Sequence, residues 1–401
     1  MQSDPRAYFA AVAPVRRDRC AICGGGLESA IELPGLPLTE TYCPAPVEKP
    51  SPGIDQRLLY CNDCGHGQLE AQIAPDILYG ANYRFRTSAS ATARKGTQFF
   101  LSVLDEAAPG RRFRCVLDLG CNDLHLLSRL EKRADVRIGV DPVWRGRESE
   151  RGDPSIIVFG NAIEDMSALP EKPDLVLCRH VLEHIAEPRA VLDRLMEAAA
   201  PNALFVFEFP GLDGMIESFR FDQVFHQHLQ YFSFASFLRL LHAVGADFAM
   251  HRENFHDWGA IAVAFTRAAP GRSFVRSAPR PAMPAISRRY GLFRRQMAAA
   301  SEVLAELRGT RIYGYGAAQM LPVLAYHLGT DLSQLEAVLD DDPAKDGMGY
   351  WNLPVRVVHS SRANDIAQAS VLVTAPDNVQ PIMTRLLAMR PRHILYPFNV
   401  I

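Results

Sequence analysis

The stretch "VLDLGCNDLHLLSRL", residues 116–130, decides the fold class of this chain. It begins as an apolar run, turns at Gly120 and continues with leucines at helical spacing. Gly120 allows a ligand to approach the backbone closely, and the helix after it presents free N–H groups in its first turn. A strand, a glycine turn and a helix in this order predict the ligand-binding edge of a parallel sheet.

The chain on both sides of this stretch continues the alternation of strands and helices. After it, Ser233 is placed to cap a helix that Gly245 can end. The apolar face of that helix would carry Phe237, Leu238, Leu241 and Val244. Strands are predicted at residues 115–120, 137–141, 155–160, 174–179 and 204–209. The pattern predicts an α/β fold with a mostly parallel sheet.

An acidic residue stands where a nucleoside ligand would need one. Asp141 ends the second predicted strand, about 20 residues after the glycine turn, where a carboxylate can accept hydrogen bonds from two ribose hydroxyls. An ordinary strand-to-helix connection without a ligand is the alternative, and these residues alone leave both open.

Four cysteines near the N-terminus form two C-x-x-C pairs, "CAIC" with Cys20 and Cys23 and "CNDC" with Cys61 and Cys64. Each pair can place two thiolates on one tight turn, at the angle that tetrahedral zinc requires. We predict a structural Zn²⁺ that stabilises folding, because four protein ligands leave no open position for catalysis. Free thiols in two unrelated turns are the alternative, and Cys43 or His66 could replace one ligand.

Length and composition exclude several classes of protein. A chain of 401 residues is too long for one ordinary core, and a hydrophobic fraction of 48 % with net charge −2 excludes a disordered or nucleic-acid-coating protein. No apolar run reaches the roughly 18–20 residues of a membrane helix, and the N-terminus does not resemble a signal peptide. We expect a cytoplasmic protein whose eight cysteines are thiols or metal ligands.

The C-terminal third predicts a second, smaller unit. Residues 268–284 are rich in Pro, Gly and Arg and predict a linker. Apolar residues then recur at steps of three and four from Ile286 to Leu307, which predicts one long helix that ends near Gly309. The segments "RIYGYGAAQ" (311–319), "LEAVLDDDP" (335–343) and "SVLVTAP" (370–376) predict a glycine-turn α/β domain.

Three segments together resemble class I S-adenosylmethionine methyltransferases. The opening stretch resembles motif I of that family, "FGNAIED" (159–165) its adenine-contacting segment, and "CRHVLEHI" (178–185) the segment after its fourth strand. Leu124 is a departure, because a glycine is often found there. The resemblance implies S-adenosylmethionine as the cofactor, bound by Asp118, Gly120, Asn122, Asp141, Asn161, Ala162 and Arg179.

The order of the modules is similar to that of nucleotide-sugar C-methyltransferases of deoxysugar pathways. This resemblance covers nearly the whole chain. It implies a zinc-binding module (1–75), a class I methyltransferase Rossmann-like core (76–267), a linker and long helix (268–308) and a smaller Rossmann-like C-terminal domain (309–401). The substrate of that family is typically a thymidine-diphosphate 4-keto sugar, methylated on the carbon beside the ketone. A small-molecule acceptor is therefore expected, and neither nucleic acid nor membrane is expected as a partner. The protein is expected to be a monomer or a homodimer.

Methylation of such a carbon requires a base for the carbon-bound proton and donors for the enolate oxygen. Histidine titrates at about pH 6.5 and suits the role of base. The resemblance places His228, in "FDQVFHQHLQYFS" (221–233), as that base, His184 as a donor to the enolate oxygen and Tyr79 as a substrate-facing residue. His226 would lie on the same side as His228 in an extended segment and would couple to it or bind substrate. A structural or substrate-binding histidine is the alternative for position 228.

Two departures from the family concern the acceptor site. Phe225 and Gln227 stand where the family usually has Tyr and Glu. A glutamine can orient an imidazole but cannot stabilise its cation by charge, which lowers the expected basicity of His228. "NFHDWGA" (254–260) replaces the Gly-Gly-Ser turn of the family, and Trp258 either stacks on a ligand or packs under the sheet.

Three other functions compete with this hypothesis. A methyltransferase of the same architecture could act on O, N or C of another glycosyl or natural-product acceptor. A nicotinamide-dependent dehydrogenase is suggested by "YGYGAAQ" (313–319) and the acids at 340–342, although the glycines do not follow G-x-G-x-x-G. A zinc-ribbon nucleic-acid binder is disfavoured by the near-neutral charge and the lack of a basic stripe.

Overall fold

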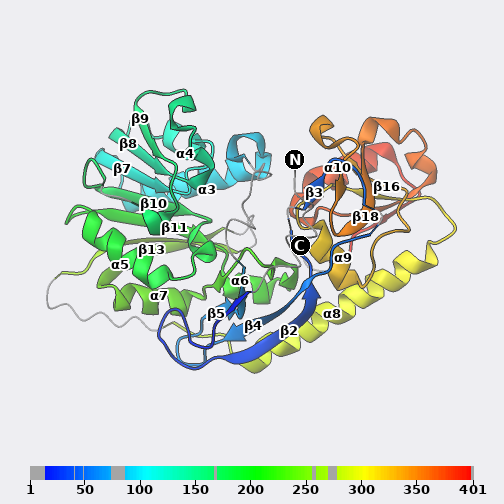
Figure 1. Ribbon diagram of the computed structural model, residues 1–401, viewed down its shortest axis with the longest axis horizontal. Coiled ribbons are helices and arrows are strands. Elements are labelled where there is room, and N and C mark those ends of the chain that lie inside the picture. The colour runs from blue at the N-terminus through cyan, green and yellow to red at the C-terminus, as the bar shows by residue number, and fades with distance from the viewer. Residues whose placement is uncertain are drawn as a thin grey trace.

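The computed structural model describes residues 14–39, 41–47, 49–73, 86–166, 169–254, 259–269 and 278–398. Figure 1 shows two α/β lobes, each built on its own twisted sheet, above a base to which the N-terminal strands contribute. A long helix crosses this base beneath both lobes. The arrangement leaves the two sheets side by side and joins them through the N-terminal segment.

The larger sheet has seven strands in the order β13-β14-β11-β10-β7-β8-β9. Its five parallel strands confirm the predicted ones: β7 (Phe113–Leu119), β8 (Ala134–Val140), β9 (Ile156–Phe159), β10 (Leu175–Arg179) and β11 (Leu204–Phe209). The hairpin of β13 (Ala246–Asn254) and β14 (Ala260–Arg267) adds an antiparallel edge beside β11. The chain order reverses between β7 and β10, so their carboxyl ends lie at a switch point, where such sheets bind ligands.

Helices cover both faces of this sheet. Neighbouring residues of β7 face opposite cores: Val116 packs with α3 (Ala91–Ala107) and α4 (His125–Ser128), and Leu117 packs with α5 (Pro188–Ala198) and α7 (Phe234–Ala243). Burial on both faces explains why the parallel strands are continuously apolar instead of alternating. The side chain of Ser233 accepts the backbone N–H of Ser236 at 3.1 Å, which confirms the predicted cap of α7.

The N-terminal module forms a four-stranded antiparallel sheet in the order β12-β5-β4-β2. Three strands come from the module: β2 (Glu28–Leu36), β4 (Ile54–Tyr60) and β5 (Gly67–Leu69). The fourth, β12 (Gln230–Tyr231), comes from the histidine segment and pairs with β5. The N–H of Leu69 also donates to the carbonyl of Leu229 at 2.9 Å. The chain immediately after His228 is therefore held as a strand of the N-terminal sheet.

The C-terminal sheet has the order β20-β19-β15-β16-β18-β17-β3. Its strands are β15 (Ile312–Tyr315), β16 (Ala337–Asp340), β17 (Gly349–Tyr350), β18 (Leu353–His359), β19 (Ser370–Val373) and β20 (His393–Leu395), with helices α9 (Leu321–Leu328) and α10 (Val379–Met389). The outermost strand, β3 (Tyr42–Cys43), belongs to the segment that the sequence assigns to the zinc-binding module. The N-terminal segment thus contributes strands to two sheets.

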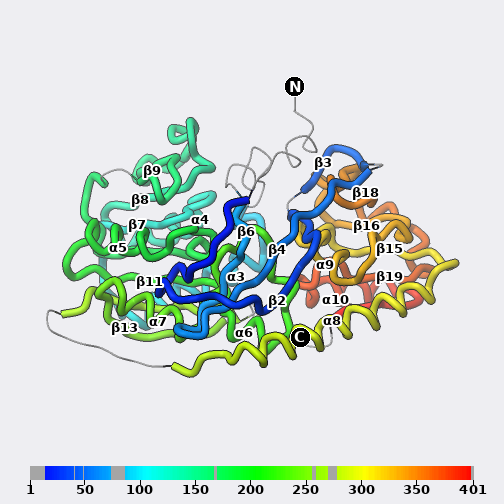
Figure 2. Tube along the Cα trace, turned by 60° about the horizontal axis from the view of Figure 1, so that its bottom comes forward, coloured from blue at the N-terminus to red at the C-terminus, as the bar shows by residue number. Residues whose placement is uncertain are grey.

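The long helix α8 (Met283–Glu306) confirms the periodicity seen in the sequence. Its buried residues are Ile286, Phe293, Met297, Ala300 and Leu304. It ends at Glu306, three residues before the predicted stop at Gly309. Figure 2 shows α8 along the base of the molecule, where it packs against β2, α6 (Leu212–Glu217) and α9. The apolar stripe of α8 thereby packs against elements of more than one part of the molecule.

The glycine turn of the C-terminal sheet bonds to groups of the protein itself. The N–H of Ala317 donates to Asp340 at 2.8 Å, and the ammonium of Lys345 lies 3.1 Å from the same carboxylate oxygen. The carbonyl of Ala317 accepts from the hydroxyl of Tyr42 at 2.7 Å. The acid and the turn that suggest a dinucleotide site are therefore engaged within the protein.

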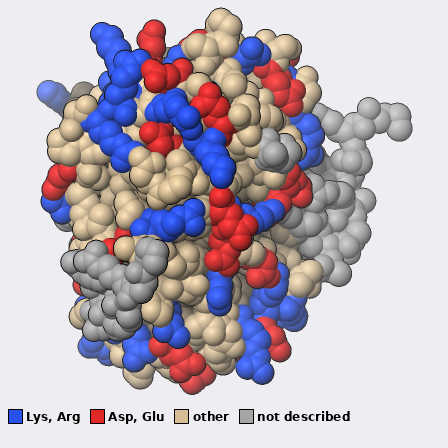
Figure 3. Space-filling model, turned by 90° about the vertical axis from the view of Figure 1, so that its left-hand side faces the viewer, with Lys and Arg blue, Asp and Glu red and all other residues tan. Residues whose placement is uncertain are grey.

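The surface carries both signs of charge. In Figure 3, which shows the outer side of the larger lobe, lysines and arginines are interspersed with aspartates and glutamates. Among the helices of the described ranges, none is both long and apolar enough to span a membrane.

A buried ion cluster joins the histidine segment to the C-terminal lobe. Arg220 bonds to Asp222 at 2.6 and 2.7 Å and to Asp377, which precedes α10, at 2.7 Å. The Arg220 and Asp222 side chains are only 1 % and 4 % exposed. Removal of one member would leave a buried charge without compensation.

We expect Arg220→Met to lower the free energy of unfolding by about 3–5 kcal/mol, the usual effect of breaking a buried ion pair. Urea denaturation followed by circular dichroism measures it. Arg112→Met is the matched control, because the Arg112–Asp135 pair is more than half exposed and exposed pairs contribute about 0–1 kcal/mol. Equal losses in the two variants would contradict a joining role for Arg220.

Candidate active site and zinc centre

The four predicted metal ligands come together at one point. The sulfurs of Cys20 and Cys64 lie 3.6 Å apart, and those of Cys23 and Cys61 lie 3.5 Å apart. All four sulfurs lie within 4.8 Å of one another. Zn–S bonds of about 2.3 Å in a tetrahedron separate the sulfurs by about 3.8 Å, so this spacing fits zinc.

Each C-x-x-C pair is held by the same backbone turn. The N–H of the glycine that follows the pair, Gly24 or Gly65, donates to the carbonyl of the first cysteine at 2.9 Å. Both glycines have positive φ, +72° and +81°, which other residues rarely adopt. The two turns therefore present their thiols in the same way and face each other.

The chemistry of the donor set also fits a metal. The S–H of Cys64 lowers the pKa of Cys20 to about 4, whereas burial raises the pKa of Cys61 to about 11. A divalent cation would favour the thiolate form of all four side chains. The two possible substitutes lie outside the cluster: the Cys43 thiol donates to the Ala45 carbonyl, and His66 bonds to Gln230.

The glycine turn after β7 lies against the loop that carries His184. Gly120 has φ +70°, and a Cβ placed on it would come within 2.2 Å of the Val181 side chain. Val181 directly precedes the 3-10 turn Leu182–His184. The absence of a side chain at position 120 therefore lets the loops after β7 and β10 meet.

Asp141 stabilises the same turn from the end of β8. Its two carboxylate oxygens accept the backbone N–H groups of Asn122 at 2.8 Å and Val143 at 2.9 Å. Burial raises the pKa of Asp141, and these two hydrogen bonds oppose that rise. Each oxygen keeps a second lone pair that can accept from a ligand hydroxyl.

Asp118, near the end of β7, is buried. Burial, together with the nearby Asp141 carboxylate, raises the pKa of Asp118 well above its usual range. A cationic ligand at this edge would favour the charged form and offset the rise. The carboxyl group is therefore suited to a positively charged cofactor.

Leu124 shows how the chain tolerates the missing glycine. Its φ of +64° lies in the left-handed region, which a glycine adopts without steric cost. Leu124 and Asn122 together bend the chain into α4, and the leucine side chain is buried in the core. The family departure thus changes the side chain while the glycine-like backbone conformation is retained.

The remaining predicted cofactor residues differ in their surroundings. Asn161 is exposed and Ala162 half-buried in the turn after β9. Arg179 instead forms an ion pair with the fully buried Glu208 of β11, 2.5 Å away. Its position after β10 matches the prediction, but its guanidinium is directed at a neighbouring strand.

Two predicted active-site histidines meet at the edge next to this turn. The rings of His184 and His228 lie 5.0 Å apart, edge to face. Nδ1 of His184 lies 2.8 Å from the carbonyl of Gln227, so Nδ1 carries the proton and Nε2 the lone pair of the neutral ring. Phe225 packs against the His228 ring at 4.1 Å, where the family hydroxyl is missing.

The sequence did not single out Glu183, which completes this group. Its carboxylate is 1 % exposed and lies within 4.8 Å of nitrogens of both His184 and His228. Burial raises its pKa, but His180, His184 and His228 together outweigh burial and lower it to about 2. Its place inside "LEHI" is the signal that could have identified it.

His226 does not face this site, contrary to the prediction. The segment turns at this point, with the N–H of His228 donating to the carbonyl of Phe225, so the two histidines do not share a side. Nδ1 of His226 lies 3.3 Å from Gln56 and Nε2 lies 3.0 Å from the carbonyl of Leu36. Both nitrogens are therefore used in packing the N-terminal module. Tyr79 and Trp258 lie outside the described residues.

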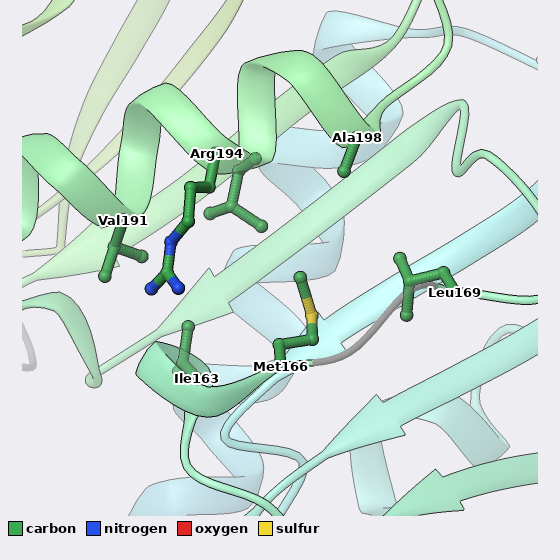
Figure 4. A pocket seen from close by; sticks show the side chains of 7 residues that line it. Ile163, Met166, Leu169, Val191, Arg194 and Ala198 are labelled. Carbon is green, nitrogen blue, oxygen red and sulfur yellow. The ribbon is translucent and has the colours of Figure 1, made fainter.

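A separate cavity of about 200 Å³ lies between α5 and the turn after β9. Figure 4 shows its apolar lining and Arg194, whose guanidinium donates to the carbonyl of Glu164 at 2.5 Å. Its lining residues are Ile163, Met166, Leu169, Val191, Arg194, Leu195 and Ala198. None of the predicted site residues lines it, so it is not the predicted cofactor site.

Family comparison agrees with this geometry. Residues 89–249 match the family described as "Methyltransferase domain", and residues 20–79 match the "Putative zinc binding domain". The chain carries a methyltransferase domain. The class I methyltransferase Rossmann-like fold expected from the sequence is thereby confirmed, as is a cysteine cluster suited to structural zinc.

One curated relative is the C-methyltransferase NovU of Streptomyces niveus. It is 26 % identical over 217 residues, a match that covers 53 % of this chain and about half (51 %) of NovU. This likeness supports the predicted resemblance to nucleotide-sugar C-methyltransferases.

Solved structures of methyltransferases are also similar to this chain. The N-methyltransferase NodS of Bradyrhizobium japonicum, in complex with S-adenosylhomocysteine, is 15 % identical with a TM-score of 0.35, covering 44 % of this chain and 88 % of NodS. The 1,6-didemethyltoxoflavin-N1-methyltransferase of Burkholderia thailandensis is 14 % identical with a TM-score of 0.34, covering 45 % and 80 %.

We expect the purified protein to contain one zinc ion per chain, and Cys61→Ser to lose it and to melt at a lower temperature. Loss of one thiolate opens the tetrahedral site. Metal analysis by mass spectrometry and thermal melting measure both effects. Cys43→Ser, which changes a buried thiol outside the cluster, should keep the metal. A Cys61→Ser variant with full zinc content would contradict the assigned ligands.

Gly120→Ala should raise the Kd for S-adenosylhomocysteine by about tenfold or more, because the added methyl displaces Val181 and strains a positive φ. Isothermal titration calorimetry measures this. Gly110→Ala is the control, since Gly110 has φ +66° but open space around an added Cβ. Its backbone strain is similar and its Kd should be unchanged. Equal affinities in all three proteins would exclude the Gly120 turn from the cofactor site.

Proposed function

We propose that the protein transfers a methyl group from S-adenosylmethionine to the carbon beside the ketone of a nucleotide-linked sugar. The proposal is carried by the His184–His228 pair, which lies beside the glycine turn of a methyltransferase domain. The two elements are joined through Val181, so an acceptor at the histidines would lie next to a donor at the turn. The likeness to a C-methyltransferase supports carbon as the atom that receives the methyl group.

The residues at this edge suit proton removal followed by methyl transfer. When bound, S-adenosylmethionine supplies a methyl group on a positively charged sulfur, a good leaving group. Asp118 and Asp141 would hold the donor at the carboxyl ends of β7 and β8. His228 would take the proton from the acceptor carbon, and His184 would face the oxygen that gains charge. Positioning is then the main task of the protein.

The structure makes the role of His184 more specific. Because Nδ1–H donates to the carbonyl of Gln227, Nε2 can donate to an enolate oxygen only when the ring is protonated. In the neutral ring, Nε2 accepts. The proposed role therefore requires the imidazolium form of His184, with a negative charge close by.

The structure also revises the expected basicity of His228. Burial and the neighbouring His184 lower its pKa to about 3, while Glu183 acts in the opposite direction. A group with this pKa is neutral at pH 7 and is a weaker proton acceptor than an unperturbed histidine. Its base form is lost only as the pH falls through about 3.

A second acceptor class is favoured by the two departures at this edge. Phe225 replaces a hydroxyl and Gln227 replaces a carboxylate of the nucleotide-sugar family, so the acceptor contacts differ from the family pattern. A methyltransferase of the same architecture acting on O, N or C of another glycosyl or natural-product acceptor fits these changes. The cytoplasmic location and the monomeric or homodimeric state stay predictions from the sequence.

Product analysis separates the two acceptor classes. The protein is incubated with an isotopically labelled methyl donor and a panel of thymidine-, guanosine- and cytidine-diphosphate keto sugars. Carbon NMR of the product should show the label on the carbon beside the ketone. Label on oxygen or nitrogen, or no product from any keto sugar, would refute the proposed reaction.

We expect His228→Ala to reduce kcat by about 100-fold or more, the usual effect of losing a general base, with the donor Kd nearly unchanged. Steady-state kinetics and calorimetry with S-adenosylhomocysteine measure the two quantities. His242→Ala, which removes an exposed histidine from α7, is the control and should retain full turnover. Retained turnover in His228→Ala would assign His228 a structural role.

The pH dependence of kcat/KM tests the lowered pKa of His228. An unperturbed histidine base would lose about tenfold of its activity between pH 7.5 and pH 5.5, because its pKa is about 6.5. With a pKa of about 3, His228 stays unprotonated over this interval, so we expect less than about a twofold loss. A loss of kcat/KM as a group with a pKa near 6.5 takes up a proton would contradict the environment described for His228.

A further inference from the structure

Glu183 is the one acidic side chain in the His184–His228 group, and it lies at the end of the loop that meets the glycine turn. Its carboxylate is buried, and within the described part of the chain neither oxygen meets hydrogen-bond geometry. Its Oε1 lies 3.4 Å from Nδ1 of His180. Nitrogens of His184 and His228 lie within 4.8 Å. Three imidazoles thus lie around this carboxylate, and Nε2 of one of them, His180, also lies 3.7 Å from the carboxylate of Glu208.

A buried carboxylate requires a positive charge or strong hydrogen bonds near it. The guanidinium of Arg179, at the end of the strand before this loop, is paired with Glu208. The histidines are the neighbours of Glu183 that can gain a positive charge by taking up a proton. A histidine of this cluster can therefore take up one proton while the carboxylate of Glu183 balances the charge.

Residue 227 orients the pair but has no charge to offer. The backbone carbonyl of Gln227 accepts the Nδ1–H of His184 at 2.8 Å. The side-chain oxygen of Gln227 accepts the hydroxyl of Thr39 at 2.6 Å. Both contacts are neutral, so any cation that forms on the histidines must be balanced from elsewhere.

We propose that Glu183 is the positioning carboxylate of this site and balances the positive charge that forms on the His184–His228 pair during proton transfer. It does so from the β10 loop, in place of a carboxylate at position 227. This inference rests on the proposed function. Glu183 acts through the two rings and does not contact the acceptor.

The proposed step balances in atoms and charge. The acceptor C–H bond breaks, its proton moves to a ring nitrogen of His228, and its electron pair stays on the acceptor. That pair forms the new carbon–carbon bond as the carbon–sulfur bond breaks, with the electrons of the latter going to sulfur. His228 then releases the proton to solvent. Glu183 stays ionised throughout and holds the imidazolium in place.

A divalent cation is the competing occupant, because two histidines and a carboxylate are a known ligand set for such ions. A bound ion would take the lone pair of His228 and remove the base that the proposed reaction requires. The sulfonium is already a good leaving group and needs no Lewis acid. Charge balance by Glu183 is therefore the better account, and metal binding is an outcome that the experiment must test.

The kinetic test compares Glu183→Gln, Glu183→Asp and the double variant Glu183→Gln/Gln227→Glu in the full-length protein. We expect Glu183→Gln to reduce kcat by about 30-fold or more with KM and donor Kd changed less than about twofold. Glu183→Asp should retain most of kcat, since the charge is kept. The double variant should recover about tenfold, because it returns a carboxylate to the other side of the same rings.

A second measurement needs no acceptor and so separates this inference from the proposed reaction. NMR of histidines labelled at Cε1 reports the titration of each ring. Loss of the carboxylate should make His228 and His184 harder to protonate in Glu183→Gln. If no keto sugar is methylated but this change occurs, the proposed function fails and the assignment of Glu183 stands.

Three results would overturn the inference. The first is a Glu183→Gln variant with kcat within about threefold of the original protein. The second is an unchanged titration of both rings in that variant. The third is binding of a second equivalent of Co²⁺, beyond the one at the cysteines, with d–d absorption that Glu183→Gln abolishes. That result would make the cluster a metal site.

Discussion

The pairing of β12 with β5 is the constraint on which the candidate active site depends. Residues 230 and 231 lie two and three positions after His228, and they complete the sheet of the zinc-binding module. The second cysteine turn leads into β5, and β5 pairs with β12. This pairing holds the chain next to His228, so that the His228 ring lies beside the loop after β10. A structural metal centre can therefore influence the proposed site without contacting it, because it holds the chain that carries His228.

Electrostatics at the two edges of the site are complementary. The donor edge contains the buried carboxyl group of Asp118 and the half-buried one of Asp141, and burial raises the pKa of both. The acceptor edge contains the His228 imidazole, whose pKa is lowered by burial, beside the carboxylate of Glu183, whose pKa is lowered by the histidines around it. A cationic donor suits the first edge, and a transient proton suits the second. Asp118 lies in β7, and Glu183 lies in the loop after β10, the strand that pairs with β7.

Much of the fold could be predicted because it depends on local patterns. The strands, the cap of α7 at Ser233 and the stripe of α8 follow from apolar periodicity and capping, and all were confirmed. The cysteine cluster could be predicted because C-x-x-C spacing restricts geometry strongly. The predicted placement of His226 was wrong because it assumed an extended segment. The chain turns there instead, and the ring of His226 lies in the N-terminal module. Glu183 was overlooked because only the folded chain brings His228, which is distant in sequence, next to its carboxylate.

The sequence by itself determined the α/β class, the zinc ligands, the glycine turn and the candidacy of His184 and His228, because each depends on residue type at short spacing. Only the tertiary structure decided which groups share the site. In the folded chain, Glu183 lies beside the rings of His184 and His228, Arg179 forms an ion pair with Glu208, and His226 bonds to the carbonyl of Leu36 outside the site. These contacts join residues from separate strands and modules, so their charges and distances arise only when the chain has folded.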